Sequence, residues 1–564
     1  NLIVVIARFL DSAYYHPNDI IELKQGQLRG HRLTSRKDRE IFAFQGIPYA
    51  QSPVGNLRFK PPQPPQPWQG ILDATKDGSE CLQRNFFNPD EDLQGEEDCL
   101  YLNVFTPKKP GSARDVLLDV MFWIHGGGWI SGSGGSLMYG PQFLLDKDIV
   151  LVTINYRLGA LGFLSTGDSV CPGNNGLKDQ VAALRWVRNN IAAFGGNPNS
   201  VTIFGESAGG SSVHYHMLSP LSRGLFHRSI SQSGTALLNW AFAPNGSTVH
   251  HTRKLASLVG CPTEPSNALL LCLKNRDAKE IASKDKEFME WDSDPMIPFN
   301  VVVETDDEAF LTKTPEESVL ASSSEHLVPW MVGLNSADGA LDTASKTFHI
   351  NPSNLNDRFN ELVSLMFFIR ETTLSPVATN ISEQIRKFYF GNHQLSQEIS
   401  SNLTNMFTDA FIFAGTNQAV KLHSQKKSSS VYYYLFDYRG THSYSSMFGD
   451  FTHDYGVTHQ DELLYLFPED HLFPNATRSQ DDDKMVEFLT TLWTNFAHRG
   501  YGNPTPKTSG LQTWDRVSSS STLEYAHIRG DGLHMEKNLF KKRADFWSSL
   551  PLHFKSSTTP RQDL

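Results

Sequence analysis

One short segment constrains the fold of this chain more than any other. The apolar run at residues 201–204 (VTIF) passes directly into residues 205–209 (GESAG), and a helix-like stretch continues to Met217. This is a GxSxG motif between a strand and a helix, where the serine occupies a sharp turn with its hydroxyl exposed. Ser207 is therefore predicted to be a nucleophile. The alternative is a glycine-rich turn whose serine only caps the following helix.

The flanking sequence predicts the architecture around this turn. Residues 120–124 (VMFWI) and 149–154 (IVLVTI) are continuous apolar runs, typical of strands buried on both faces. Apolar residues then recur at positions 177, 181, 184, 187 and 191, which is the spacing of one helical stripe. Strands that alternate with helices indicate an α/β fold, with a large central, mostly parallel sheet flanked by helices.

Composition narrows the class of protein. The chain has 564 residues, of which 39% are hydrophobic, so it can bury a large core and is neither disordered nor collagen-like. A net charge of −11 with no long Lys/Arg run disfavours a nucleic-acid partner. Length alone suggests several domains. Because no repeat or linker divides the sequence, we predict one domain over residues 20–555 and a polar tail at 556–564.

The first nineteen residues are predicted to be a lead into the domain. The apolar stretch at residues 2–10 is interrupted by Arg8 and is too short to cross about 30 Å of hydrocarbon. No membrane span is therefore expected. The stretch fits the remnant of a secretory signal peptide, with Ala13 as a candidate cleavage edge. The alternative interpretation is a buried first strand.

The cysteines allow two short loops to be closed. Pairing Cys81 with Cys99 and Cys261 with Cys272 would leave Cys171 unpaired, and each closed loop would contribute roughly 3 kcal/mol. No CxxC motif or Cys/His cluster has zinc spacing, so no metal is expected.

Glycosylation sequons add to the case for secretion. The four candidate sites are Asn245, Asn380, Asn402 and Asn475. Together with the cysteines and the N-terminal stretch, they favour a secreted, extracellular protein.

A serine nucleophile needs a histidine base and an acidic residue that orients it. In this kind of fold both follow the serine in the sequence, the acid first and the histidine second. His459, in a loop-like stretch after the apolar run at 431–436, is the best candidate for the base, with His453 as its rival in the same loop. Asp338 follows the apolar run at 330–334 and would orient the imidazole. Its competitor is Asp342, and a loop aspartate could also simply stabilise its own turn.

The oxyanion of an acyl-transfer reaction needs backbone N–H donors. The run at 120–124 leads into residues 125–129 (HGGGW), which match the HGGG loop of esterases and lipases. The amides of Gly127, Gly128 and Ala208 are the predicted donors. A phosphate-binding loop is disfavoured because no GK[ST] or GxGxxG follows.

Several motifs together resemble the type B carboxylesterase family, which includes cholinesterases and insect carboxylesterases. They lie at residues 44–50 (FQGIPYA), 97–104 (EDCLYLNV), 155–159 (NYRLG) and 194–209 (FGGNPNSVTIFGESAG). The resemblance implies a single α/β-hydrolase domain with a gorge above Ser207. It also implies Asp338 as the acid, His459 as the base, and the disulfides Cys81–Cys99 and Cys261–Cys272.

The sequence departs from the family in four places. Most members carry Glu where this chain has Asp338. Residues 86–89 (FFNP) lack the tryptophan that cholinesterases place before Asn-Pro to stack on quaternary ammonium, which argues against acetylcholinesterase. Juvenile-hormone esterases usually have Gln where this chain has Glu206. The polar C-terminus lacks the helical tail of oligomeric cholinesterases, which favours a monomer.

The sequence therefore predicts a secreted serine hydrolase that cleaves small to medium hydrophobic carboxylic esters through an acyl-enzyme. The expected partner is a small-molecule ester, and no cofactor is expected. The alternatives are a juvenile-hormone-type esterase and, from another class, a catalytically silent adhesion or binding ectodomain.

Overall fold

The computed structural model describes residues 19–85, 91–109, 116–243, 246–322, 327–349, 352–395, 400–426, 430–450, 453–473, 477–498, 503–505 and 512–552. Nearly all of the predicted lead, the polar tail and the FFNP segment lie outside these residues. The domain boundaries therefore stay a prediction. No helix in the described part of the chain is long and apolar enough to cross a bilayer.

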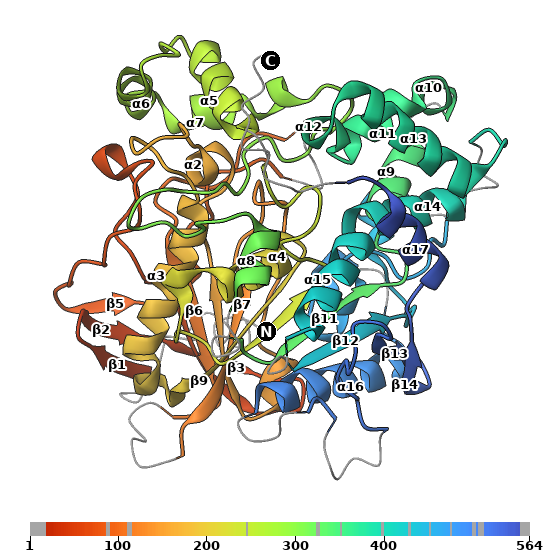
Figure 1. Cartoon of the computed structure of the whole chain (residues 1–564). Coiled ribbons are helices and arrows are strands. Elements are labelled where there is room, and N and C mark those ends of the chain that lie inside the picture. The colour runs from red at the N-terminus through yellow and green to blue at the C-terminus, as the bar shows by residue number, and fades with distance from the viewer. Residues whose placement is uncertain are drawn as a thin grey trace, which may run out of the picture.

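An 11-stranded sheet runs through the centre of the molecule (Figure 1) in the order β14-β13-β12-β11-β10-β9-β7-β8-β6-β4-β3. Its strands are β3 (His31–Thr34), β4 (Glu40–Pro48), β6 (Tyr101–Thr106), β7 (Leu118–Ile124), β8 (Ile149–Ile154), β9 (Gly196–Glu206), β10 (Arg228–Gln232), β11 (Trp330–Asn335), β12 (Val431–Phe436), β13 (Glu524–Arg529) and β14 (Gly532–Lys537). A small second sheet holds β1 (Ile20–Leu23), β2 (Gly26–Arg29) and β5 (Ile71–Asp73).

The helices cover the sheet and gather at one end of it. They are α2 (Gly159–Phe163), α3 (Asn175–Asn190), α4 (Ala208–Leu218), α5 (Ser247–Leu258), α6 (Ser266–Lys274), α7 (Ala278–Ala282), α8 (Pro315–Ala321), α9 (Ala340–His349), α10 (Pro352–Asp357), α11 (Phe359–Met366), α12 (Ile369–Thr372), α13 (Ser375–Phe390), α14 (Ser400–Thr408), α15 (Ala414–Ser424), α16 (Gln480–Ala497) and α17 (Lys541–Ser549). In Figure 1, α5–α7 and α10–α13 form the upper part of the molecule.

The strands from β8 to β13 pair in parallel, and the two outer parts of the sheet are antiparallel. The prediction of an α/β fold with a mostly parallel sheet is thus confirmed. Parallel strands carry their carboxyl ends to the same edge, so the residues that follow β7, β9, β10 and β11 meet there.

The continuous apolar strands are explained by burial on both faces. Alternate residues of β7 point to opposite sides, so Val120, Phe122 and Ile124 join one core with residues of α3 and α4. Met121 and Trp123 join a second core with residues of α16. Each face of the central sheet therefore has its own hydrophobic layer.

The helical stripe predicted from residue 177 to 191 lies on α3, which ends at Asn190. The chain then tightens into a 3-10 turn at Ile191–Phe194 and is stopped by Gly195 at φ 79°. This turn feeds β9, the strand that delivers Ser207.

Candidate functional site

Ser207 lies on the turn between β9 and α4. Its backbone has φ 57° and ψ −122°, a conformation that a non-glycine residue keeps only when the surroundings enforce it. One constraint is the hydrogen bond that the Ser207 N–H donates to Gln232 O (2.8 Å). Another is Gly209, where a Cβ would collide with Ile124 O. The Ser207 side chain makes no capping bond to α4, which excludes the capping role.

His459 and Asp338 form a buried pair. Nδ1 of His459 lies 2.8 Å from Oδ1 of Asp338, and the Asp338 residue is 2% exposed. The other carboxylate oxygen, Oδ2, accepts hydrogen bonds from Ser233 Oγ (3.0 Å) and from the Asn335 N–H (2.9 Å). The carboxylate is thus held from β10 and β11, which fixes the imidazole orientation.

The two rival residues lie elsewhere. Asp342 is half-buried in the first turn of α9 and lines a neighbouring cavity. The carboxylate that contacts His459 Nδ1 belongs to Asp338. His453 is exposed and packs its ring against Tyr455 at 4.8 Å. The geometry therefore favours Asp338 and His459 over both competitors.

The second imidazole nitrogen faces another carboxylate. Nε2 of His459 lies 2.9 Å from Oε1 of the fully buried Glu206, and Gln460 Nε2 donates to Oε2 of Glu206 (3.2 Å). Burial by itself lowers the pKa of His459. The charge of Glu206 and the hydrogen bonds to Asp338 and Glu206 outweigh burial and raise this pKa well above its ordinary value. The sequence alone predicts no role for Glu206 at the site.

The predicted oxyanion donors have unoccupied N–H groups. Gly127 and Gly128 follow β7 at φ 95° and 61°, and a Cβ on Gly127 would collide with Ser131 O. Ala208 is the first residue of α4, where an amide has no partner in its own helix. Within the described residues, none of these three N–H groups donates a hydrogen bond. They are thus able to receive a developing negative charge beside Ser207.

A buried glutamate ties the segments of the site together. Glu462 accepts hydrogen bonds from Gln232 Nε2 (3.0 Å) and from Asn335 Nδ2 (2.5 Å), and Asn335 Nδ2 also donates to Thr458 O (2.7 Å). These partners lie next to Ser207, Asp338 and His459 respectively. The glutamate is three residues beyond His459, but no sequence signal pointed to this function.

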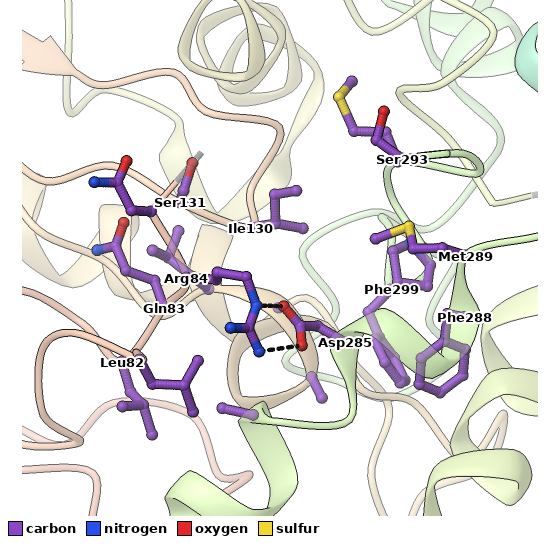
Figure 2. Close-up of a pocket in the computed structure, with 18 of the residues that line it drawn as sticks. Leu82, Gln83, Arg84, Ile130, Ser131, Asp285, Phe288, Met289, Ser293 and Phe299 are labelled. Atoms are coloured by element: carbon purple, nitrogen blue, oxygen red, sulfur yellow. Dashed lines mark hydrogen bonds and ion pairs between the residues drawn. The ribbon is translucent and has the colours of Figure 1, made fainter. Parts of the chain in front are cut away.

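A cavity of about 310 Å³ borders the site (Figure 2). Ile130 and Ser131 line it, and their N–H groups both donate to Gly127 O. Leu341 lines it from the start of α9, where its N–H donates to Asp338 O. Most of the remaining wall is apolar, with Phe288 and Phe299 among its residues. The cavity is therefore an apolar chamber beside the candidate catalytic residues.

The structure joins Cys81 to Cys99 and Cys261 to Cys272, the pairs that the resemblance implies, and leaves Cys171 as a buried thiol. Burial raises the pKa of Cys171 to about 12, so this thiol is unreactive. The described residues contain no group of three or more His, Cys, Asp or Glu that could hold a metal ion.

Two of the four sequon asparagines lie in the described part of the chain. Asn380 on α13 and Asn402 on α14 are both exposed. Asn245 and Asn475 lie outside it, and glycosylation stays a prediction at all four sites.

A serine on a strand–turn–helix elbow, an Asp–His pair whose Asp338 follows β11 and a glycine-rich loop of open amides define an α/β-hydrolase. The model of the carboxylesterase family matches residues 17–547, so the chain belongs to this family. The predicted family is confirmed, and the protein is a carboxylic ester hydrolase.

Curated relatives agree with this assignment. Esterase FE4 of Myzus persicae is 41% identical over 92% of this chain and 90% of its own length. A juvenile hormone esterase of Tribolium castaneum is 37% identical over 97% of this chain and 96% of its own length. An acylcarnitine hydrolase of Mus musculus is 35% identical over 88% of this chain and 85% of its own length.

Proposed function

We propose that Ser207, His459 and Asp338 are the catalytic triad of this esterase, with the amides of Gly127, Gly128 and Ala208 as its oxyanion hole. The observation that carries the proposal is the 2.8 Å contact between His459 Nδ1 and Asp338 Oδ1, at the same sheet edge as the strained turn of Ser207. A fixed imidazole at the same sheet edge as a serine on a sharp strand-to-helix turn is the arrangement that acyl transfer requires.

The reaction proceeds through an acyl-enzyme. Ser207 Oγ attacks the ester carbonyl while His459 takes the hydroxyl proton, and the three amides bind the resulting oxyanion. His459 then protonates the leaving alcohol as the carbon–oxygen bond breaks. A water molecule, deprotonated by His459, attacks the acyl-enzyme; the bond between Ser207 Oγ and the acyl carbon then breaks, His459 returns the proton to Oγ, and the carboxylic acid is released. Asp338 and Glu206 stabilise the imidazolium formed in both halves of the reaction.

The substrates are small to medium hydrophobic esters. The adjoining cavity of about 310 Å³ has a mostly apolar wall, which suits an apolar acyl or alcohol group. A hydrophobic wall discriminates by about 1–3 kcal/mol per methylene, so several esters of similar size are accepted.

We further propose that the enzyme acts outside the cell. Two disulfides within short loops support this placement, because such bonds persist in oxidising compartments. The amounts of the protein in the culture medium and in the cell lysate, measured after expression in insect cells, test this proposal. If all of the correctly processed protein stays in the lysate, the proposal is contradicted.

Covalent labelling tests the triad. An organophosphate should add its phosphoryl group to Ser207 in the folded enzyme, located by peptide mass spectrometry, and should abolish ester hydrolysis. Ser207→Ala should neither be labelled nor hydrolyse esters. Ester hydrolysis without any label on Ser207 would contradict the assignment, and a folded protein that neither labels nor hydrolyses would support the silent-ectodomain alternative.

A second candidate function is juvenile-hormone hydrolysis. Its support is the 37% identity to the Tribolium castaneum relative over 97% of this chain. Comparing kcat/KM for juvenile hormone with that for simple esters of similar size tests it. A preference for the hormone of at least two orders of magnitude would favour this function, and parity would favour the general esterase.

A further inference from the structure

An ion pair interrupts the apolar wall of the cavity beside the triad. Nε of Arg84 donates to Asp285 Oδ2 (2.7 Å), and Nη2 donates to Oδ1 (2.9 Å). Figure 2 shows the two side chains meeting among the lining residues, with Ile130 above the pair and Phe299 to its right in this view. The pair is therefore part of the surface that an ester in this cavity would meet.

The two partners are held from separate segments. Arg84 belongs to the loop closed by the Cys81–Cys99 disulfide, and its Nη1 also donates to Glu91 O (3.1 Å). Asp285 begins the 3-10 turn Asp285–Phe288. Because the guanidinium donates to both Asp285 oxygens and to Glu91 O, the pair has a defined geometry before any ligand arrives.

The carboxylate keeps acceptor capacity toward the cavity. Each Asp285 oxygen accepts one N–H from Arg84, whereas an ionised carboxylate offers about four lone-pair sites. The Asp285 side chain is 32% exposed and lines the cavity. A ligand O–H or N–H can therefore bond to Asp285 while the ion pair stays intact.

Charge limits which ligands fit. Among the described residues that line the cavity, Arg84 carries the one cationic side chain, whereas Asp285, Asp292 and Asp342 carry carboxylates. An anionic ligand would lose its hydration on entering the cavity, and the guanidinium of Arg84 is already paired with Asp285, so no ion pair would compensate for that loss. A neutral hydrogen-bond donor satisfies Asp285 without adding a charge.

We propose that the Arg84–Asp285 pair is a binding subsite for neutral esters that carry a second polar group, an alcohol or amide N–H donor, remote from the scissile carbonyl. This inference rests on the proposed function, because it places the scissile ester at Ser207. The enzyme then prefers hydroxylated amphiphilic esters to plain hydrocarbon esters and to esters with a free carboxylate.

Paired substrate series test the subsite. In one series the acyl chain of a nitrophenyl ester ends in methyl and in the other it ends in hydroxyl, with matched lengths from two carbons upward. A parallel pair of alkyl acetate series places the methyl or the hydroxyl at the end of the alcohol chain instead. At one chain length the hydroxylated ester should have a kcat/KM about tenfold higher, the size of effect expected for one hydrogen bond to a charged group. No preference at any length in either pair would overturn the proposal.

Variants separate recognition from a structural role. Arg84→Met combined with Asp285→Leu removes both charges together and leaves neither one unpaired in the cavity. This double variant should lose the hydroxyl preference while it still hydrolyses the acetate ester. The matched control is Arg358→Met with Glu361→Leu, which removes an exposed bidentate pair at the start of α11 and should keep the preference. If the Arg84/Asp285 variant keeps the preference, or loses activity equally toward every ester, the pair only fastens the loop and the proposal is wrong.

Failure of the proposed function has a different signature. If Ser207 is not labelled by organophosphate and the wild-type protein hydrolyses no ester in either series, the triad assignment fails. If Ser207 is labelled and the esters are hydrolysed without a hydroxyl preference, the subsite alone is wrong.

Discussion

Oε1 of Glu206 lies 2.9 Å from Nε2 of His459, the imidazole nitrogen that must take the proton of Ser207. Because Asp338 holds the other nitrogen at 2.8 Å, the ring lies between two buried carboxylates. This environment stabilises the imidazolium that forms in each half of the reaction. It also means that the resting imidazole is more basic than an ordinary histidine.

The pH dependence of catalysis should report this second carboxylate. Glu206 raises the pKa of His459, and only neutral His459 can accept the serine proton. Glu206→Gln removes the charge, so the pKa of His459 should fall and the acid limb of the kcat/KM profile should move to lower pH. The exposed Glu361→Gln is the control and should leave the limb in place. An acid limb that does not move in Glu206→Gln would show that Glu206 does not control the charge on the base.

The identity of the triad acid should be visible in two neighbouring substitutions. Asp338→Asn keeps the shape but removes the charge that orients and stabilises His459, so kcat should fall by about 10⁴-fold. Asp342→Asn, only four residues away, should leave kcat close to the wild-type value, because it is Asp338 and not Asp342 that contacts His459 Nδ1. Steady-state hydrolysis of one activated ester measures both. The reverse ranking would make Asp342 the acid.

Glu462 should be needed for the positions of the triad segments. Glu462→Met keeps much of the volume but removes the acceptor of Gln232 Nε2 and of Asn335 Nδ2. Asn335 Nδ2 keeps its bond to Thr458 O, but each of the two amides loses one buried acceptor, which should cost about 1–3 kcal/mol per lost bond in the free energy of unfolding. Because the Gln232 O and Asn335 N groups also hold Ser207 and Asp338, kcat should fall more than KM rises. Urea unfolding and steady-state kinetics on the same preparation test both effects, and wild-type kcat would contradict a positioning role.

Stability should fall as the pH rises toward about 8. Burial raises the pKa of Glu469 from 4.5 to about 8, and that of Asp461 from 3.8 to about 7. Between the unfolded and folded pKa values the folded protein binds more protons than the unfolded chain, so raising the pH destabilises it. At a pH above the folded-state pKa values the loss of stability is complete, and at a pH below the unfolded-state pKa values there is no loss.

Glu469→Gln isolates one of these groups. The variant has no charge to bury at residue 469, so its Tm should decline less between pH 5 and 8 than the wild-type Tm. Differential scanning calorimetry over this range measures the difference. Parallel curves for the two proteins would show that Glu469 is not the source of the decline.

The two disulfides should differ in their effect on catalysis. Replacing either pair with serine should lower the free energy of unfolding by about 3 kcal/mol through loop entropy. Only the Cys81–Cys99 loop carries Arg84, so only its opening should raise KM for long esters. Substitution of Cys261 and Cys272 is the control, and equal KM changes in the two variants would contradict this division.

Much of the site could be predicted from the sequence because its key residues lie in local patterns. The turn of Ser207 needs glycines at fixed places between a strand and a helix, and the loop of Gly127 and Gly128 follows a strand directly. Both are short-range constraints. His459 and Asp338 carry no such local signature, so the resemblance to a family was needed to choose them over His453 and Asp342.

The sequence alone determined the elements of this protein, because the continuous apolar strands, the helical stripe of α3 and the glycine turns are set by burial and backbone sterics within a few residues. The tertiary structure decided which distant side chains share one environment. Glu206 meets His459 although the two lie far apart in the sequence, and Arg84 meets Asp285 from a separate segment. Such contacts arise from strand order and loop packing, because charges interact through space whatever their separation along the chain.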